Sequence, residues 1–406
     1  MSMIELDAMP AADLAGAGRS RLILDAIEAA GLTRMADGWA DVLSGIDPDR
    51  VTAELRRPAR YDPVRLAALL SPAAGLCLED MARAAHHLTR RRFGNAISLF
   101  APLYLSNYCV NRCRYCGFNS GTRHRRRRLS IDEAAAEAGI IASEGFRDIL
   151  LVSGEDAANI NVDYLSRLAD RLLREIGFAS VSVEINIQSE DSYRQLFAAG
   201  IEGVTIFQET YNQDAYAAWH PFGPKAVYAD RLMASEAAAR AGMRRLGLGV
   251  LLGLEDWRFD AMAMAAHADA LSRHYWRVRT SFSFPRVRPS ENGGREKFPH
   301  LLSDAELTQM ILALRLCFPD SGLTLSTRES PELRNSLIPL GITQISAGSK
   351  VNPGGYGDGD VASTGQFEIA DERSAGEMAE FLVKTGFDPI WKDWDPGFAA
   401  GRGEGT

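Results

Sequence analysis

The chain has 406 residues, of which 46% are hydrophobic and 24% are charged, with a formal net charge of -8. This length and composition are typical of a globular protein with a large core, and the acidic balance excludes a bulk attraction to nucleic acid. No apolar run approaches the roughly 20 residues that cross a bilayer, so we expect no membrane partner.

The cysteines and the N-terminus favour a cytoplasmic protein. Five cysteines, three clustered and two isolated, do not match the framework of a secreted disulfide protein. Residues 1–18 contain three carboxylates and no Lys or Arg, unlike the basic start of a signal peptide. Cys77 and Cys317 lie in apolar helical surroundings, and we interpret them as small buried hydrophobes.

The first 95 residues are expected to form an N-terminal helical extension, because apolar residues recur at helical spacing over 20–30 and 65–88. Short apolar runs then alternate with longer helical stretches. The eight predicted strands cover residues 103–109, 148–154, 180–186, 203–210, 245–254, 278–287, 322–330 and 343–349. The predicted helices between them include 131–144, 162–176, 189–199, 226–241, 259–274, 303–317 and 331–340.

Eight strand–helix units over about 250 residues predict an α/β fold, a (β/α)8 TIM-type barrel over residues 96–350. An open doubly wound sheet is the alternative. It is weakened because no G-x-G-x-x-G follows the first predicted strand. Residues 351–406 are expected to form a turn-rich loop, a helix and a tail over the barrel mouth.

Cys109, Cys113 and Cys116 are spaced C-x3-C-x2-C at the end of the first predicted strand. Thiolates this close must share a disulfide, a zinc ion or an iron–sulfur cluster. Zinc lacks a fourth ligand here, and the candidate His124 lies among arginines that repel a further cation. A [4Fe-4S] cluster on three cysteines has one open iron that can bind an amino group and a carboxylate. We favour the cluster, with zinc and a structural role as alternatives.

Polar and glycine residues recur at or near the ends of the other predicted strands, where barrel enzymes carry their active sites. They are Ser153, Gly154, Glu155, Glu184, Gln208, Glu209, Thr210, Gly249, Gly253, Arg286, Arg288, Thr327, Arg328, Glu329 and Ser346.

The cysteine motif, followed by Gly117 and Phe118 and set in an eightfold β/α pattern, resembles the radical S-adenosylmethionine (SAM) superfamily. The resemblance implies a [4Fe-4S] cluster on Cys109, Cys113 and Cys116 whose open iron binds the amino and carboxylate groups of SAM. An electron from the cluster then cleaves SAM to methionine and a 5′-deoxyadenosyl radical.

The resemblance also implies a set of SAM contacts, each with a structural alternative. Ser153, Gly154 and Glu155 correspond to a Gly-Gly-Glu-like motif near the SAM amino group, or to a solvated turn. Glu184 is a candidate for the ribose hydroxyls, or a structural carboxylate. Arg245 is the candidate for the SAM carboxylate, and Arg244 competes for this role. Gly249 and Gly253 would lie beneath the adenine, or they allow tight packing. Tyr115 and Phe118 would flank the adenine, or they pack in the core.

The basic run 123–128 has two interpretations. It is a solvated loop leading to a helix capped by Ser130, or a positive surface that docks an acidic flavodoxin- or ferredoxin-type electron donor. Arg328 is the candidate clamp for a substrate carboxylate, with Ser326 and Ser346 adding hydroxyl contacts. The structural alternative pairs Arg328 with Glu329 or Glu209.

Four segments, 102–107, 207–211, 281–289 and 325–331, resemble the aromatic amino-acid lyase branch of the superfamily. The ending 389–395 is similar to the 2-iminoacetate synthases, the tyrosine lyases of thiamine thiazole biosynthesis. This resemblance implies cleavage of L-tyrosine at Cα–Cβ to 2-iminoacetate and p-cresol, and hand-over to a thiazole synthase. It assigns no residue to the phenol.

A tryptophan-type lyase and a non-catalytic metal or iron–sulfur protein stay open as alternatives. The resemblance to the hydrogenase-cofactor tyrosine lyase is rejected, because that enzyme needs a cysteine-bearing C-terminal domain for a second cluster and no cysteine follows Cys317. Biotin synthase would need further barrel cysteines for a [2Fe-2S] cluster, whereas Cys77 and Cys317 lie outside the predicted strands.

Overall fold

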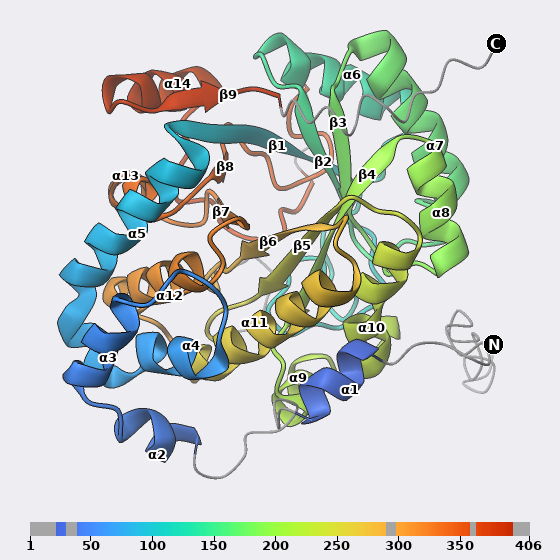
Figure 1. Ribbon diagram of the computed structural model, residues 1–406. Coiled ribbons are helices and arrows are strands. Elements are labelled where there is room, and N and C mark those ends of the chain that lie inside the picture. Colours follow the sequence, from blue (N-terminus) through green and yellow to red (C-terminus); the bar gives the residue numbers. More distant parts are fainter. Residues whose placement is uncertain (1–21, 30–38, 290–297, 358–362, 393–406) are drawn as a thin grey trace.

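The computed structural model describes residues 22–29, 39–289, 298–357 and 363–392. Within them, parallel strands close into a barrel in which β1 pairs with both β2 and β8 (Figure 1). The barrel strands are β1 (Ala96–Ser106), β2 (Asp148–Ser153), β3 (Ser180–Glu184), β4 (Ile201–Glu209), β5 (Arg245–Val250), β6 (Arg279–Ser283), β7 (Gly322–Leu325) and β8 (Gln344–Ser346). The predicted (β/α)8 barrel is confirmed, and the open doubly wound sheet is excluded.

Helices surround the barrel and connect its strands (Figure 1). They are α6 (Ile131–Ser143), α7 (Val162–Arg171), η2 (Leu172–Ile176), α8 (Glu190–Ala198), α9 (Gln213–Trp219), η3 (Pro224–Ala226), α10 (Tyr228–Arg240), α11 (Trp257–His274), α12 (Asp304–Cys317), α13 (Pro331–Leu337), η4 (Ile338–Leu340) and α14 (Ala375–Lys384). Local sequence sets several of their starts. Ser130 caps α6 as predicted, in a capping box with Glu133, and Ser303 and Ser374 form the same box at α12 and α14.

The described residues before the barrel are helical, as predicted. They form α1 (Leu22–Ala29), α2 (Trp39–Ser44), α3 (Pro48–Leu55), α4 (Pro63–Leu70), η1 (Pro72–Cys77) and α5 (Leu78–Phe93). Helix α5 packs on α12, and α4 packs on α11 and α12, so these helices share the barrel's apolar core. The domain division at 95 and 350 stays a prediction.

The first and last strands differ from the sequence-based expectation. Strand β1 begins at Ala96, seven residues before the predicted Leu103 and two residues after Gly94, the C-cap of α5, whose φ is 63°. A ninth strand, β9 (Asp388–Ile390), pairs in parallel with the start of β1. The C-terminal segment thus adds a strand to the barrel sheet. Residues 393–395 of the C-terminal motif lie outside the described residues.

The carboxyl ends of the strands meet at one mouth of the barrel, and the cysteine motif follows β1 at that end. Within the described residues, no helix combines the length and the apolar composition that a membrane span requires.

Candidate active site

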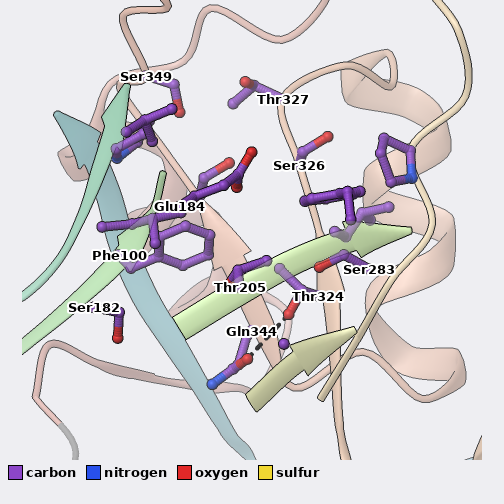
Figure 2. A pocket seen from close by; sticks show the side chains of 18 of the residues that line it. Phe100, Ser182, Glu184, Thr205, Ser283, Thr324, Ser326, Thr327, Gln344 and Ser349 are labelled. Carbon is purple, nitrogen blue, oxygen red and sulfur yellow. Dashed lines mark hydrogen bonds between the residues drawn. The ribbon is translucent and has the colours of Figure 1, made fainter. Parts of the chain in front are cut away.

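A cavity runs through the barrel interior and contains about 1220 Å³ of empty space, counting the part open to solvent. Its walls carry side chains from all eight barrel strands. Figure 2 shows part of this lining. Two of the lining positions are glycines, Gly203 and Gly247, where a Cβ would collide with the neighbouring Ser182 and Thr205. Glycine at these positions therefore leaves room inside the barrel. The space is large enough for small-molecule ligands.

Arg328, Ser326, Ser346 and Glu184 all line this cavity, so the structure brings together four of the predicted site residues. Ser326 and Arg328 follow β7, Ser346 ends β8 and Glu184 ends β3. Figure 2 shows Glu184 and Ser326 projecting into the same space. A cation, two hydroxyls and a carboxylate thus face one ligand-sized volume.

Arg328 is not part of a structural ion pair among the described residues. Glu329 accepts hydrogen bonds from Arg286 and Arg288 instead, and Glu209 pairs with Lys225 at 2.5 Å. The structural alternative for Arg328 is therefore wrong. Its guanidinium carbon lies 3.5 Å from the centroid of the Phe367 ring, and burial lowers its pKa below the ordinary value. The cation stays available to an anionic ligand.

Burial also acts on the Glu184 carboxylate, whose pKa it raises. Burial inside the barrel, with the nearby charge of Glu209, raises its pKa to about 7. A carboxyl group that is protonated part of the time both donates and accepts hydrogen bonds, which suits ligand hydroxyls.

The three cysteines lie beside one wall of the cavity. Cys109 and Cys116 pack against an apolar cluster whose members Tyr104, Val152 and Val351 also line the cavity. The backbone N–H of Phe118 donates to Cys116 Sγ at 3.4 Å. All three thiols are free, and burial raises the pKa of Cys113 to about 12 and that of Cys116 to about 11. Neutral thiols of this kind become thiolates when they coordinate a metal.

The cysteine loop is held by close backbone contacts. A Cβ on Gly117 would collide with the carbonyl of Gly365, and one on Gly154 with the carbonyl of Tyr108. Among the described residues, no three His, Cys, Asp or Glu side chains group closely enough to bind one metal ion. In a four-iron cluster each thiolate binds a different iron, so its ligands need no such grouping. The donor set and the fixed loop fit a cluster.

The turn after β2 contacts the cysteine loop directly. The carbonyl of Glu155 accepts from the Val110 N–H at 3.3 Å, and its carboxylate accepts from the Asn111 amide at 3.1 Å. Ser153 Oγ donates to the carbonyl of Gly154. Glu155 is therefore a carboxylate next to Cys109, where the sequence analysis expects the SAM amino group.

Arg231 is a candidate cation for the SAM carboxylate that was not predicted from the sequence. It lies in α10, is 7% exposed, and its Nε donates to the carbonyl of Phe207 at 2.9 Å. Burial lowers its pKa, but the nearby Tyr216, Glu209 and Glu155 outweigh burial and hold the pKa above the ordinary value. Sequence gave little signal, because α10 alternates charged and small residues like many surface helices.

Arg245 does not lie where the prediction needs it. It is the first residue of β5, at the amino end of the barrel, and it binds Asp148, Ser180 and Ser182. The cysteines follow β1 at the opposite end. An arginine that begins a parallel strand is one barrel length away from the mouth, so a contact with the SAM carboxylate is not favoured.

The predicted adenine site is only partly supported. Phe207 packs over Gly249, and Gly253, with φ 120°, approaches Val287 so closely that a Cβ would collide. Tyr115 donates to or accepts from His220 Nε2 at 2.8 Å, and Phe118 packs edge-on to Tyr104. None of these except Phe207 and Tyr104 lines the cavity. The packing alternatives for Gly253, Tyr115 and Phe118 agree with these contacts.

The basic run divides into two parts. Arg126 donates to the carbonyls of Phe118 and Asn119, and Arg128 forms a bidentate pair with Asp156. These side chains fix the cysteine loop. Arg123 and Arg125 are exposed, and they have no ion pair among the described residues. Part of the run is therefore structural, and part is a free positive surface.

Two family models match the chain. The Radical SAM superfamily matches residues 103–266, and the Biotin and Thiamin Synthesis associated domain matches residues 283–388. The 2-iminoacetate synthases of Escherichia coli (strain K12) and Salmonella typhimurium are each 43% identical to this chain over 361 residues, covering 88% of this chain and 94% of theirs.

Solved structures agree with these matches. A crystal structure of HydG, a maturase of the FeFe hydrogenase, matches with a TM-score of 0.86 and 32% identity, covering 93% of this chain and 83% of that chain. Methylornithine synthase (PylB) matches with a TM-score of 0.66 at 20% identity, covering 87% of this chain and 99% of that chain, and supports the fold alone.

Proposed function

The chain belongs to the 2-iminoacetate synthase family of radical SAM enzymes, and on that premise we propose that it cleaves the Cα–Cβ bond of L-tyrosine to 2-iminoacetate and p-cresol. Superfamily membership implies an iron–sulfur cluster and SAM. Assigning a [4Fe-4S] cluster to Cys109, Cys113 and Cys116 is part of the proposal, supported by their free thiols and fixed loop.

The observation that carries the proposal is the guanidinium of Arg328 inside the barrel, which has no ion-pair partner in the described part of the chain. Its potential partners Glu329 and Glu209 are bound elsewhere, so it can hold the substrate carboxylate. Phe367 stacks on the guanidinium and fixes its plane, which favours two-point binding of a carboxylate. Ser326, directly after β7, and Ser346, at the end of the adjacent β8, add hydroxyls to the cavity wall.

When bound, the cluster supplies the electron that splits SAM into methionine and a 5′-deoxyadenosyl radical, which takes a hydrogen atom from the substrate amino group. The protein's own side chains position the reactants. Glu155, which bonds Asn111 of the cysteine loop, offers a carboxylate to the SAM amino group. Arg231, which is buried and donates to the carbonyl of Phe207, is the candidate cation for the SAM carboxylate. Glu184 is the candidate partner of the ribose hydroxyls.

The C-terminal segment contributes the exclusion of water that a radical reaction needs. Tyr104 Oη donates to Gln366 Oε1 at 2.7 Å, and the N–H of Gly117 donates to the carbonyl of Gln366 at 3.1 Å. Gln366 and its neighbour Phe367 both line the cavity. This segment therefore bridges the cysteine loop and the substrate side of the cavity.

Two protein partners complete the proposal. A flavodoxin- or ferredoxin-type reductant would dock where exposed Arg112, Arg123 and Arg125 surround the cysteine loop. Neutralising the three should slow reduction by the protein donor but not by dithionite, and unchanged donor kinetics would exclude this surface. A thiazole synthase is the proposed acceptor of 2-iminoacetate, because the imine hydrolyses in water.

Anaerobic reconstitution tests the proposed function. The reduced protein with SAM should form p-cresol and 5′-deoxyadenosine from L-tyrosine, and L-tryptophan should not replace it. Preference for tryptophan would assign the chain to the other lyase class. Zinc at the cysteines without SAM cleavage would refute the enzyme.

A further inference from the structure

We infer that Gln344 and Thr324 form the subsite that recognises the para-hydroxyl group of the substrate, an inference that rests on the proposed tyrosine lyase function. Thr324 Oγ1 donates to Gln344 Oε1 at 3.0 Å, and both residues line the cavity on adjacent strands (Figure 2). Neither residue belongs to the proposed SAM or carboxylate sites.

The register of β7 and β8 places this pair deeper in the cavity than Ser326 and Ser346, by about the length of the tyrosine side chain. Thr324 pairs with Gln344 across the two strands, and Ser326 and Ser346 follow each of them by two residues. Residues two apart face the same side of a strand and lie about 6.6 Å apart along it. This separation is comparable to the reach of a p-hydroxybenzyl group. A carboxylate held at Arg328, Ser326 and Ser346 therefore brings a phenol down to Thr324 and Gln344.

The hydrogen bond between the two side chains defines what the subsite offers. Because Thr324 occupies Gln344 Oε1, the Gln344 amide group faces a ligand as a donor. Among the described residues, the hydrogen bond from Thr324 is the side-chain hydrogen bond that Gln344 forms, and its amide nitrogen donates to no protein group. A phenolic oxygen accepts from such an amide, whereas a phenyl ring would leave it unpaired.

The charged pair deeper in the barrel does not compete for this role. The Arg245 guanidinium binds Asp148 at 3.0 Å and Ser182 at 2.9 Å, and it also bonds Ser180. Asp148 and Arg245 thus satisfy each other, while Phe100 supplies an aromatic wall beside them. Among the described residues at this depth of the cavity, the amide of Gln344 is a polar group that is open to a neutral phenol.

The test compares L-tyrosine turnover with inhibition by L-phenylalanine in Gln344→Leu and Thr324→Val holoenzymes. Wild type should bind L-tyrosine more tightly than L-phenylalanine. In both variants kcat/KM for L-tyrosine should fall about 10- to 100-fold, while the inhibition constant of L-phenylalanine stays within about twofold. Thr324→Ser, which keeps the hydroxyl, should restore most of the discrimination.

Thr343→Val is the matched control, because it removes a hydroxyl from the neighbouring residue, which bonds the Leu323 N–H and does not line the cavity. It should keep the wild-type preference. If Gln344→Leu and Thr324→Val both keep that preference, the subsite assignment is wrong although the lyase function stands. If wild type itself forms no p-cresol, the proposed function fails and this inference fails with it.

Discussion

The guanidinium carbon of Arg328 lies 3.5 Å from the centroid of the Phe367 ring, so a residue after β7 and a residue of the C-terminal segment form one site. The stacked ring orients the cation without neutralising it. No carboxylate among the described residues pairs with this guanidinium. The substrate carboxylate is the partner that we assign to it.

Arg328→Lys should raise the KM for L-tyrosine and lower p-cresol formation about 10- to 100-fold, because lysine keeps the charge but loses the planar two-point geometry. Formation of 5′-deoxyadenosine should fall much less, since SAM binds elsewhere. Steady-state assays of both products measure the uncoupling. Arg123→Lys, on the exposed part of the basic run, is the control, and equal loss of both products in Arg328→Lys would contradict the assignment.

Replacing Cys109, Cys113 or Cys116 by alanine should abolish SAM cleavage and lower the iron content, while the barrel stays folded. Cys77→Ala serves as control, because Cys77 lies at the end of η1, outside the barrel strands. Iron analysis, circular dichroism and 5′-deoxyadenosine assays report the three properties separately. Retained turnover in any one of the three variants would remove that cysteine from the ligand set.

Asp371→Asn should destabilise the C-terminal segment strongly. Asp371 and Arg334 are both fully buried and form an ion pair, and Arg334 also donates to the carbonyl of Ser346. Burial alone would raise the pKa of Asp371, but Arg373 and Arg334 hold it below its ordinary value.

The variant leaves a buried cation without its counter-charge, at a cost of about 3–5 kcal/mol in the free energy of unfolding. Urea denaturation measures this change. Exposed Glu372→Gln is the neighbouring control, and equal stability of the two variants would contradict the account.

The free energy of unfolding should decrease as the pH is lowered, partly because of His267. Its imidazole is buried between Tyr211 Oη at 2.8 Å and Ser235 Oγ at 2.7 Å, and burial lowers its pKa to about 3. As pH falls from about 6.5 towards 3, the unfolded state takes up a proton that the folded state refuses. The free energy of unfolding therefore decreases by up to about 1.4 kcal/mol per pH unit from this group.

Denaturation curves between pH 7 and 5 should thus be less pH-dependent for His267→Gln than for wild type. Exposed His274→Gln should follow the wild-type profile. Parallel profiles for His267→Gln and wild type would show that His267 carries no such linkage.

The barrel and much of the site could be predicted because strand ends in such a fold converge on one mouth. Arg328, Ser326, Ser346 and Glu184 follow or end their strands, and they share one cavity. The cysteine spacing identified the superfamily, and the family matches support it.

The predictions failed for residues whose location depends on their position along a strand or on packing between distant elements. Arg245 was a candidate for the SAM carboxylate, but β5 begins at that residue, so its side chain lies at the amino end of the barrel with Asp148. Arg231 was missed because burial of a helix residue depends on what packs over it. Phe367 was missed because its contact with Arg328 joins segments 39 positions apart by a path that no local pattern encodes.

The isotope content of 5′-deoxyadenosine tests the central claim most directly. In D2O the amino hydrogens of L-tyrosine exchange for deuterium, whereas its carbon-bound hydrogens do not. If the cavity presents the amino group for hydrogen abstraction, 5′-deoxyadenosine formed along with p-cresol should carry one deuterium. Unlabelled 5′-deoxyadenosine, or its formation from L-tyrosine without p-cresol, would contradict the account.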